Sequence, residues 1–153
     1  MYSKEEASMI RKKFWIAFGQ YMKLQTSASM DKVNWVNYKT GIKDLYFKTD
    51  VDHRAARISI EMTSKDPDMQ ALLYEQFEEF QPLFESTMQN DWVWHAVYFD
   101  AVGKQMAKIE LTLENVNVFR ESDWPAIIAF FKENLLKWDQ FWEDVKESFA
   151  IFK

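Results

Sequence analysis

Carboxylates near a lysine come closest, among the residues of this chain, to a catalytic arrangement. Asp44, either Asp50 or Asp52, then Glu61 and Lys65 lie on or beside a segment whose pattern predicts a β-hairpin. Magnesium-dependent nucleases use such a set, because carboxylates hold the ion and a lysine polarises the phosphate. Here Glu61 and Lys65 are separated by three residues, whereas that motif has a single residue between them. Charged side chains on a solvated strand face explain the pattern better than a metal site does.

Histidine, cysteine and glycine supply no further catalytic motif. His53 lies in a polar turn and His95 in an aromatic strand, and neither has another ligand at a spacing that suits a metal ion. The chain has no cysteine, which excludes thiol nucleophiles, zinc knuckles and disulfides. Its three glycines are isolated, so no phosphate-binding loop is expected. We therefore expect no cofactor and no metal ion, and we favour a non-enzymatic role.

Aromatic and cationic side chains are interleaved after the first predicted helix, and they form the candidate binding surface. Single-stranded nucleic-acid binders use this mixture, because bases stack on aromatic rings while cations contact phosphates. The net charge of −5 argues against such a partner, and core aromatics beside solvated lysines are the simpler explanation. The candidate binding residues are Trp35, Asn37, Tyr38, Lys39, Thr40 and Lys43 in this segment, with Arg57 and Glu61 on the following hairpin.

Length and composition indicate a globular chain with an aromatic core. A chain of 153 residues suits a single domain spanning residues 1–153, and 48% hydrophobic with 28% charged residues is ordinary for such a domain. The 13 Phe, 7 Trp and 6 Tyr are unusual and predict aromatic packing. No window is apolar enough to span a membrane, and the charged first residues are unlike a secretory signal. We expect a cytoplasmic protein.

Periodicity and end signals predict three helical regions. The first covers residues 3–22 and opens on a Ser-x-x-Glu capping box. The second begins at Asp66 and is kinked or restarted at Pro82. The third begins at Ser122 or Asp123 and continues as one helix or two. The expected buried face of the second helix carries Met69, Leu72, Leu73, Phe77 and Phe80.

Period-two alternation predicts four strands in two hairpins. The first hairpin joins residues 45–49 to residues 56–62 through a polar turn, and the second joins residues 92–99 to residues 104–113 through a turn at Gly103. The order α-ββ-α-ββ-α predicts an α+β fold, with an antiparallel sheet built from the two hairpins and helices packed on it.

The last predicted helix carries more aromatic area than the end of a small chain ordinarily buries. Aromatic residues are enriched in the cores of protein interfaces. Trp138, Phe141 and Trp142 are therefore the candidate residues of a homodimer interface.

Several segments, in the same order along the chain, resemble a bacterial family of uncharacterised proteins, the domain-of-unknown-function family 4268. No single segment is specific, but the ordered set spans nearly the whole chain. The resembling segments are Phe14–Phe18, Trp35–Phe47, Tyr74–Glu78, Asn117–Phe119, Asp123–Pro125 and Phe141–Lys146.

The resemblance implies an accessory role rather than a defined activity. Some longer members of that family look like this domain placed behind a nuclease-like domain, and this chain would then correspond to the accessory module alone. The residue patterns and the resemblance together favour an intracellular accessory or protein-interaction domain, homodimeric and without catalysis. The alternatives are a nucleic-acid-linked module, either a binder or a degenerate nuclease relative, and a small-ligand binder with an aromatic pocket lined by Trp35 or Trp92.

Overall fold

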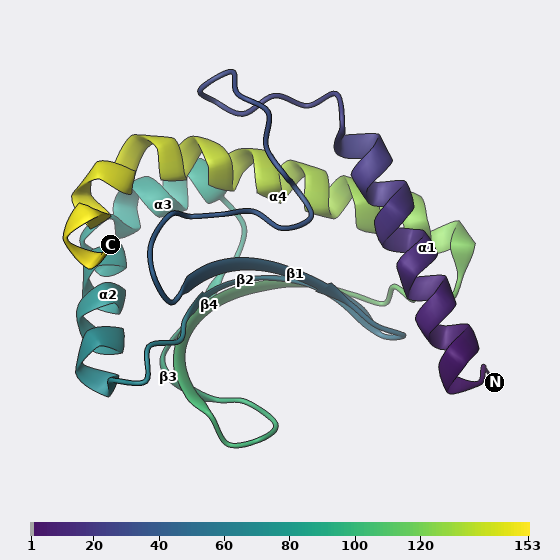
Figure 1. Cartoon of the computed structure of the whole chain (residues 1–153), viewed down its shortest axis with the longest axis horizontal. Helices are drawn as coiled ribbons and strands as arrows, with labels where there is room; N and C mark the ends of the chain where they lie inside the picture. Colours follow the sequence, from purple (N-terminus) through teal and green to yellow (C-terminus); the bar gives the residue numbers. More distant parts are fainter. Residues whose placement is uncertain (1) are drawn as a thin grey trace.

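A bent four-stranded antiparallel sheet forms the centre of the protein, and its strands follow the order β1-β2-β4-β3 (Figure 1). The computed structural model describes residues 2–153. The elements are α1 (Lys4–Met22), β1 (Leu45–Val51), β2 (Ala55–Met62), α2 (Pro67–Glu79), α3 (Gln81–Met88), β3 (Val93–Phe99), β4 (Gln105–Glu114), the short 3-10 helix η1 (Glu121–Asp123), α4 (Trp124–Val145) and the 3-10 helix η2 (Lys146–Phe152). The α+β architecture expected from the sequence is confirmed, with the second helical region divided into α2 and α3 beside Pro82.

The two predicted hairpins form, and β2 and β4 join them at the centre of the sheet. Ile58, Ile60 and Met62 alternate along β2 and are all completely buried, which fixes the register of that strand. Its opposite face pairs Ser59 with Lys48 on β1 and with Glu110 on β4. β1 and β3 are the edges.

In the described part of the chain, residues 2–153, the helices cover one face of this sheet and leave the other open. α4 runs along the convex side, α1 crosses one end, and α2 and α3 stand at the other (Figure 1). Phe47 on β1 faces α4, where its ring lies 4.6 Å from that of Trp138, while its neighbours Tyr46 and Lys48 point away and are exposed. The concave side is therefore open to solvent and carries the polar side chains of each strand.

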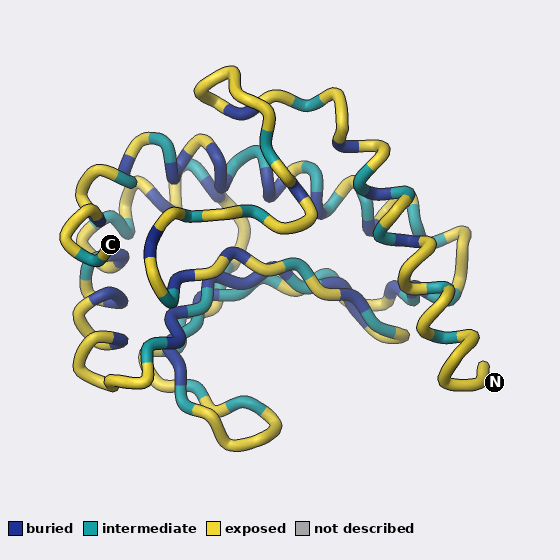
Figure 2. Tube along the Cα trace, in the orientation of Figure 1, coloured by how far each residue is buried: buried dark blue, intermediate teal, exposed yellow. Residues whose placement is uncertain are grey.

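Capping signals place the starts of α1 and α2 as the sequence predicts. Ser3 and Glu6 form the reciprocal capping box of α1, and Asp66 caps α2 with Pro67 in its first turn. The buried sides of the helices face the sheet, whereas the segment before β1 and the β3–β4 turn are largely exposed (Figure 2).

The buried face of α2 is rotated from the predicted one. Met69 and Leu72, expected inside, are exposed, and Gln70 is buried in their place. The Gln70 side-chain amide donates to the carbonyls of Ser64 and Gln105, at 2.6 and 2.9 Å, and thereby tethers α2 to the start of β4. This pair of bonds turns the apolar residues at 69 and 72 outward.

The candidate interface residues of the last helix lie instead in the core of the chain. Trp138 and Phe141 are completely buried and Trp142 nearly so. Trp138 stacks on Phe47 of the sheet and on Trp142, and Phe141 packs against Phe84 of α3. The abundance of aromatics is explained by this internal packing, so these three side chains offer almost no surface to a second copy.

Within residues 2–153, none of the helices has the combination of length and apolar character that crossing a bilayer requires.

The β1–β2 turn is organised around the carboxylate of Asp52. Its Oδ1 accepts from the backbone amides of Arg54 and Ala55, at 2.7 and 2.9 Å, and its Oδ2 accepts from Arg57 at 2.8 Å. Partial burial favours the neutral acid, but the Arg54 amide, the Arg57 side chain and the Ala55 amide outweigh it and lower the pKa of Asp52 to about 2.

Asp52→Asn should lower the free energy of unfolding at neutral pH by about 1–2 kcal/mol, because it removes a charge-assisted contact at the turn. Since the folded-state pKa is lowered, the stabilisation is complete above the ordinary aspartate pKa of about 4 and is lost as pH falls towards 2. Urea unfolding of both proteins between neutral pH and about pH 2 measures this. The difference between them should shrink as pH falls.

Asp50→Asn is the matched control, because that carboxylate is 71% exposed and lies 3.4 Å from the same guanidinium. Its effect should be much smaller. Equal losses from the two variants would contradict the role assigned to Asp52.

Candidate functional site

The segment between α1 and β1, residues 23–44, has no helix or strand of its own, yet it is held against α4. A connection of this length without secondary structure is uncommon in compact domains and is often functional. Trp35 Nε1 donates to the Gln25 carbonyl at 3.1 Å, within the segment. Trp142 Nε1, on α4, donates to the Thr40 carbonyl at 3.0 Å. The segment therefore has a defined conformation, although it forms no helix and pairs with no strand.

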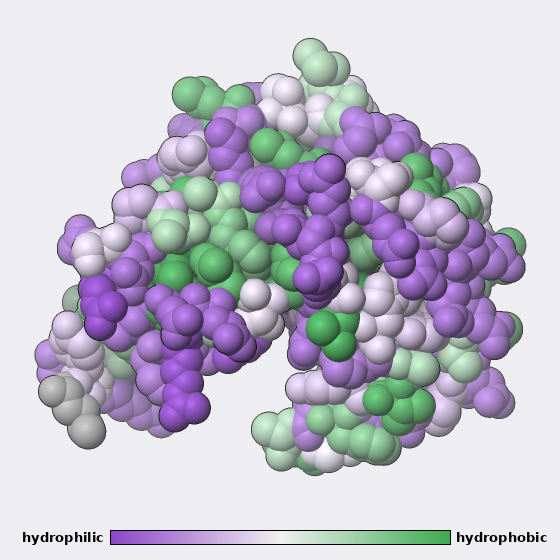
Figure 3. Space-filling model, turned by 180° about the vertical axis from the view of Figure 1, so that it is seen from behind, coloured by the Kyte–Doolittle hydropathy of each residue, from purple (hydrophilic) through white to green (hydrophobic). Residues whose placement is uncertain are grey.

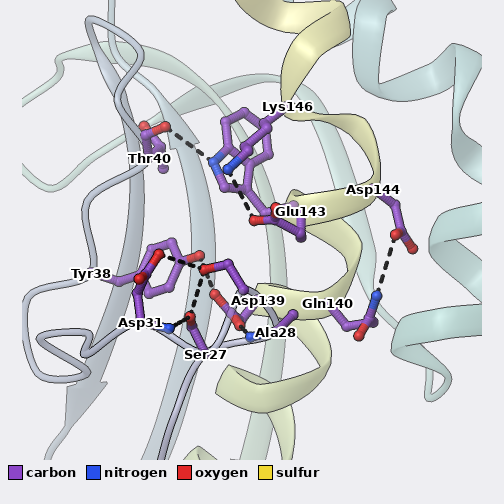
Figure 4. A network of polar contacts seen from close by, with 12 residues as sticks. Ser27, Ala28, Asp31, Tyr38, Thr40, Asp139, Gln140, Glu143, Asp144 and Lys146 are labelled. Atoms are coloured by element: carbon purple, nitrogen blue, oxygen red, sulfur yellow. Dashed lines mark hydrogen bonds and ion pairs between the residues drawn. The ribbon is translucent and has the colours of Figure 1, made fainter.

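Asp139 of α4 makes the central contact with this segment (Figure 4). Its side chain is only 5% exposed. One carboxylate oxygen accepts from the Tyr38 hydroxyl and the other from the Ala28 amide, both at 2.6 Å. Short bonds to an ionised acceptor are among the stronger hydrogen bonds in proteins. One buried carboxylate thus fixes two points of the segment, ten residues apart.

The environment of Tyr38 favours its neutral phenol. Burial contributes most, followed by the hydrogen bond to Asp139 and the negative charges of Asp139 and Glu143, and together they raise the pKa of Tyr38 well above its ordinary value. The hydroxyl therefore remains a donor to Asp139 throughout the physiological range.

A cleft of about 420 Å³ lies between this segment and the C-terminal half of α4. Within it Glu143 and Lys146 form an ion pair at 2.9 Å. Three carboxylates and three lysines share the lining with the rings of Tyr38 and Trp142, so the cleft presents a mixed surface to a ligand. The lining residues are Ser27, Ser29, Asp31, Lys32, Val33, Asn34, Asn37, Tyr38, Lys39, Thr40, Gly41, Asp139, Trp142, Glu143 and Lys146.

The eight candidate binding residues fall in different places. Four of them, Asn37, Tyr38, Lys39 and Thr40, line this cleft together. Trp35 is buried and forms a wall of a neighbouring hollow of about 380 Å³. Lys43 is exposed and lies outside the cleft lining.

Arg57 and Glu61 lie apart from the cleft, on the open face of the sheet. Glu61 is 3.5 Å from Lys48, and Arg57 contacts Asp50 and Asp52. Their charges are therefore matched by neighbours on the same face.

The nuclease-like carboxylates are divided between the two ends of that open face. Asp44, Glu61 and Lys65 line one hollow of about 500 Å³. Asp50 and Asp52 are instead bonded to Arg57. Among residues 2–153, no group of three or more acidic or histidine side chains is placed to hold a metal ion.

The middle of the open face carries an ionic network that sequence reasoning missed. Lys108 contacts Glu110 at 2.9 Å and lies 4.4 Å from the centre of the Tyr98 ring, while His95 Nε2 is 3.4 Å from Glu110. Burial opposes the charged forms, but the bonds within the pair outweigh it, raising the pKa of Lys108 and lowering that of Glu110. The alternate polar residues Lys108 and Glu110 on β4 were the available signal, but their further partners His95 and Tyr98 come from β3.

Comparison with protein families identifies the chain. The family model described as Domain of unknown function (DUF4268) matches residues 10–146. The chain belongs to this family. The match covers the segment before β1, the whole sheet and α4, so the DUF4268 family model includes the cleft as well as the fold. No curated protein and no solved structure matches the chain.

Tyr38→Phe should destabilise the DUF4268 fold by about 1.5–3 kcal/mol, because it removes a hydrogen bond to a buried carboxylate. The pKa of Tyr38 is higher in the folded chain than the unfolded value of about 10. The contribution of its hydroxyl is therefore complete below pH 10 and falls as pH rises further. Chemical unfolding of both proteins from neutral pH to about pH 11 should show the difference between them shrinking at alkaline pH.

Tyr46→Phe provides the control, since Tyr46 is exposed on the open face of the sheet. It should leave stability nearly unchanged. A Tyr38→Phe protein as stable as the wild type would show that Asp139 does not anchor the segment through this hydroxyl.

Proposed function

We propose that this DUF4268 chain is an intracellular, non-enzymatic interaction domain that forms a homodimer through the edge strand β3. The observation that carries the proposal is the difference between the two edges of the sheet. β1 carries Lys48 and Asp50, both exposed, whereas β3 has no Asp, Glu, Lys or Arg from Val93 to Phe99. Charged residues on an edge strand hinder the addition of another strand, and their absence permits it.

Exposed apolar side chains accompany the uncharged edge. Val97 and Phe99 are 58% and 59% exposed, and Val102 in the following turn is more exposed still. A bulge lies between His95 and Tyr98, where the register with β4 shifts. The space-filling view shows hydrophobic side chains gathered on the lower part of the molecule, over the β3–β4 hairpin (Figure 3).

α2 adds further exposed apolar residues near the C-terminal end of β3. Gln70 bonds the carbonyl of Gln105, and Gln105 pairs with Phe99 across the ladder. The N-terminal part of α2 is therefore tethered to the residue of β4 that pairs with the last residue of β3, and Met69 and Leu72, on either side of this tether, are exposed. We refer to Met69, Leu72, Val97, Phe99 and Val102 as the β3 patch.

A second copy of the chain is the occupant that fits the β3 patch. Antiparallel pairing of two β3 strands around a two-fold axis is self-complementary. Because β3 carries no Asp, Glu, Lys or Arg, this pairing does not bring like charges of the two strands together. The sheet would then continue across the dimer as eight strands. Elsewhere the net charge of −5 on each copy favours separation, so an uncharged contact is the favourable place for association.

Phe99→Lys and Val97→Lys should each convert the dimer to a monomer, because either places two like charges at the symmetric contact. Light scattering after gel filtration measures the mass, and circular dichroism checks that the fold is retained. The wild type should have twice the mass of the chain.

Tyr46→Lys, which adds the same charge at the other edge, should leave the dimer intact. A wild type that remains monomeric at high concentration would overturn the proposal. So would a dimer that survives both β3 substitutions.

Small-ligand binding is a second candidate function, favoured by the convergence of Asn37, Tyr38, Lys39 and Thr40 in the cleft beside α4. Its volume of about 420 Å³ is within the range of small-molecule sites. The nucleic-acid alternative has less support, because Lys48 and Arg57 are paired with carboxylates on the sheet face.

A fragment library screened by protein-observed NMR tests this second function. Fragments that bind should shift the amide signals of residues 37–40 and 139–146, and Lys39→Ala should lower the affinity of these fragments. Lys23→Ala, which removes a cation from the end of α1, should not. Hits that gather elsewhere on the chain would remove this candidate.

A further inference from the structure

The hollow at the β1–β2 turn contains three of the four arginines of the chain. It measures about 700 Å³. Its lining has three guanidinium groups, an imidazole and two side-chain amides against one carboxylate, on a chain that is acidic overall. The lining residues are His53, Arg54, Ala55, Arg57, Thr112, Glu114, Asn115, Val116, Asn117 and Arg120.

Backbone hydrogen bonds build this hollow from two segments distant in sequence. After β4 the chain turns at Asn115, which has a positive φ of 62°, and then runs beside the β1–β2 turn. Val116 donates to the Arg54 carbonyl at 3.3 Å, and Val118 donates to the Asp52 carbonyl at 3.1 Å. These bonds place Arg120 across the hollow from the arginines of the hairpin. The backbone positions from which these arginines project are therefore set by the fold.

Carboxylates outside the lining hold two of the guanidinium groups. Both ion pairs of Arg57, with Asp52 at 2.8 Å and Asp50 at 3.4 Å, are made by Nη1, which leaves its other nitrogens for a further acceptor. Arg120 Nη1 lies 3.6 Å from Asp123. A carboxylate that already holds an arginine side chain in place reduces the side-chain entropy lost when its remaining N–H groups bind a ligand. Arg54, whose amide rather than its side chain bonds Asp52, adds a third cation.

We propose that this hollow binds the phosphate group of a small phosphate-bearing molecule. Guanidinium forks match phosphate oxygens in bidentate geometry, and amide and imidazole groups add donors. The volume suits a ligand of about nucleotide size. None of the lining residues, all in the described part of the chain, is Phe, Tyr or Trp, so the site lacks the stacking surface of a single-strand binder. This site is independent of the β3 patch and of the cleft beside α4.

NMR titration of the full chain with inorganic phosphate and with pyrophosphate tests the site, at constant ionic strength set with sodium chloride. Both should shift the amides of residues 53–57 and 115–120 in a saturable way, and pyrophosphate should bind more tightly. Arg54→Ala and Arg120→Ala should each weaken binding about tenfold, since each removes a guanidinium group that donates hydrogen bonds to the phosphate. Both side chains are exposed, so the fold should be retained. Arg54→Lys should lose part of the affinity, because it keeps the charge but not the fork.

Lys23→Ala is the control for loss of one positive charge elsewhere and should bind as the wild type does. Shifts reproduced by chloride, shifts that do not saturate, or arginine variants that bind normally would overturn the proposal. Binding of a fluorescent single-stranded oligonucleotide is measured in the same way, to test nucleic acid as the ligand. If it binds through Arg54 and Arg120 while phosphate and pyrophosphate do not, the site serves nucleic acid and the small-molecule assignment is wrong.

Discussion

The buried carboxylate of Asp139 is the constraint on which the arrangement of this protein depends. A carboxylate inside the apolar stripe of a helix is costly unless donors compensate it, and the cost of leaving one unpaired is several kcal/mol. Both compensating donors, Tyr38 and Ala28, come from the long segment before β1. The next residue toward the N-terminus of α4, Trp138, stacks on Phe47 of the sheet. The same turn of α4 thus holds the segment on one side and the sheet on the other, which is why a connection without secondary structure has a fixed shape.

A second constraint acts on the opposite side of the sheet, where no helix covers the strands. Curvature brings the polar side chains of the concave face close together, so a charge there needs a neighbour of opposite sign. Lys108 and Glu110 form one ion pair, and Glu61 and Lys48 form another. These charges in the middle of the face are consequently paired with each other. A large group of donors lies at one end of the face, in the arginine hollow beside the β1–β2 turn.

Local signals in the sequence were sufficient for most of the fold and for part of the site. The capping box at Ser3, the N-cap at Asp66 and the alternation along β2 each act within a few residues, so a pattern can reveal them. The rotation of α2 was not predictable, because the tether of Gln70 ends on a carbonyl 35 residues away. The cleft shows the same division. Residues 37–40 stood out as a group, whereas their partner Asp139 is 101 residues from Tyr38 and could be suspected only as a polar residue within an apolar stripe.

The positions of the proposed surfaces bear on how they would act together. β3 pairs with β4 only from Gln105 to Glu110, so the part of β4 that reaches the arginine hollow extends beyond it. A dimer formed along β3 would leave both hollows uncovered and would hold them at a fixed separation, at the two distant ends of one continuous sheet. The proposed ligand is about nucleotide size, so one molecule would occupy one hollow, and a dimer would hold two such molecules. Dimerisation and phosphate binding would therefore be separable, because the β3 patch and the lining of the hollow share no residue.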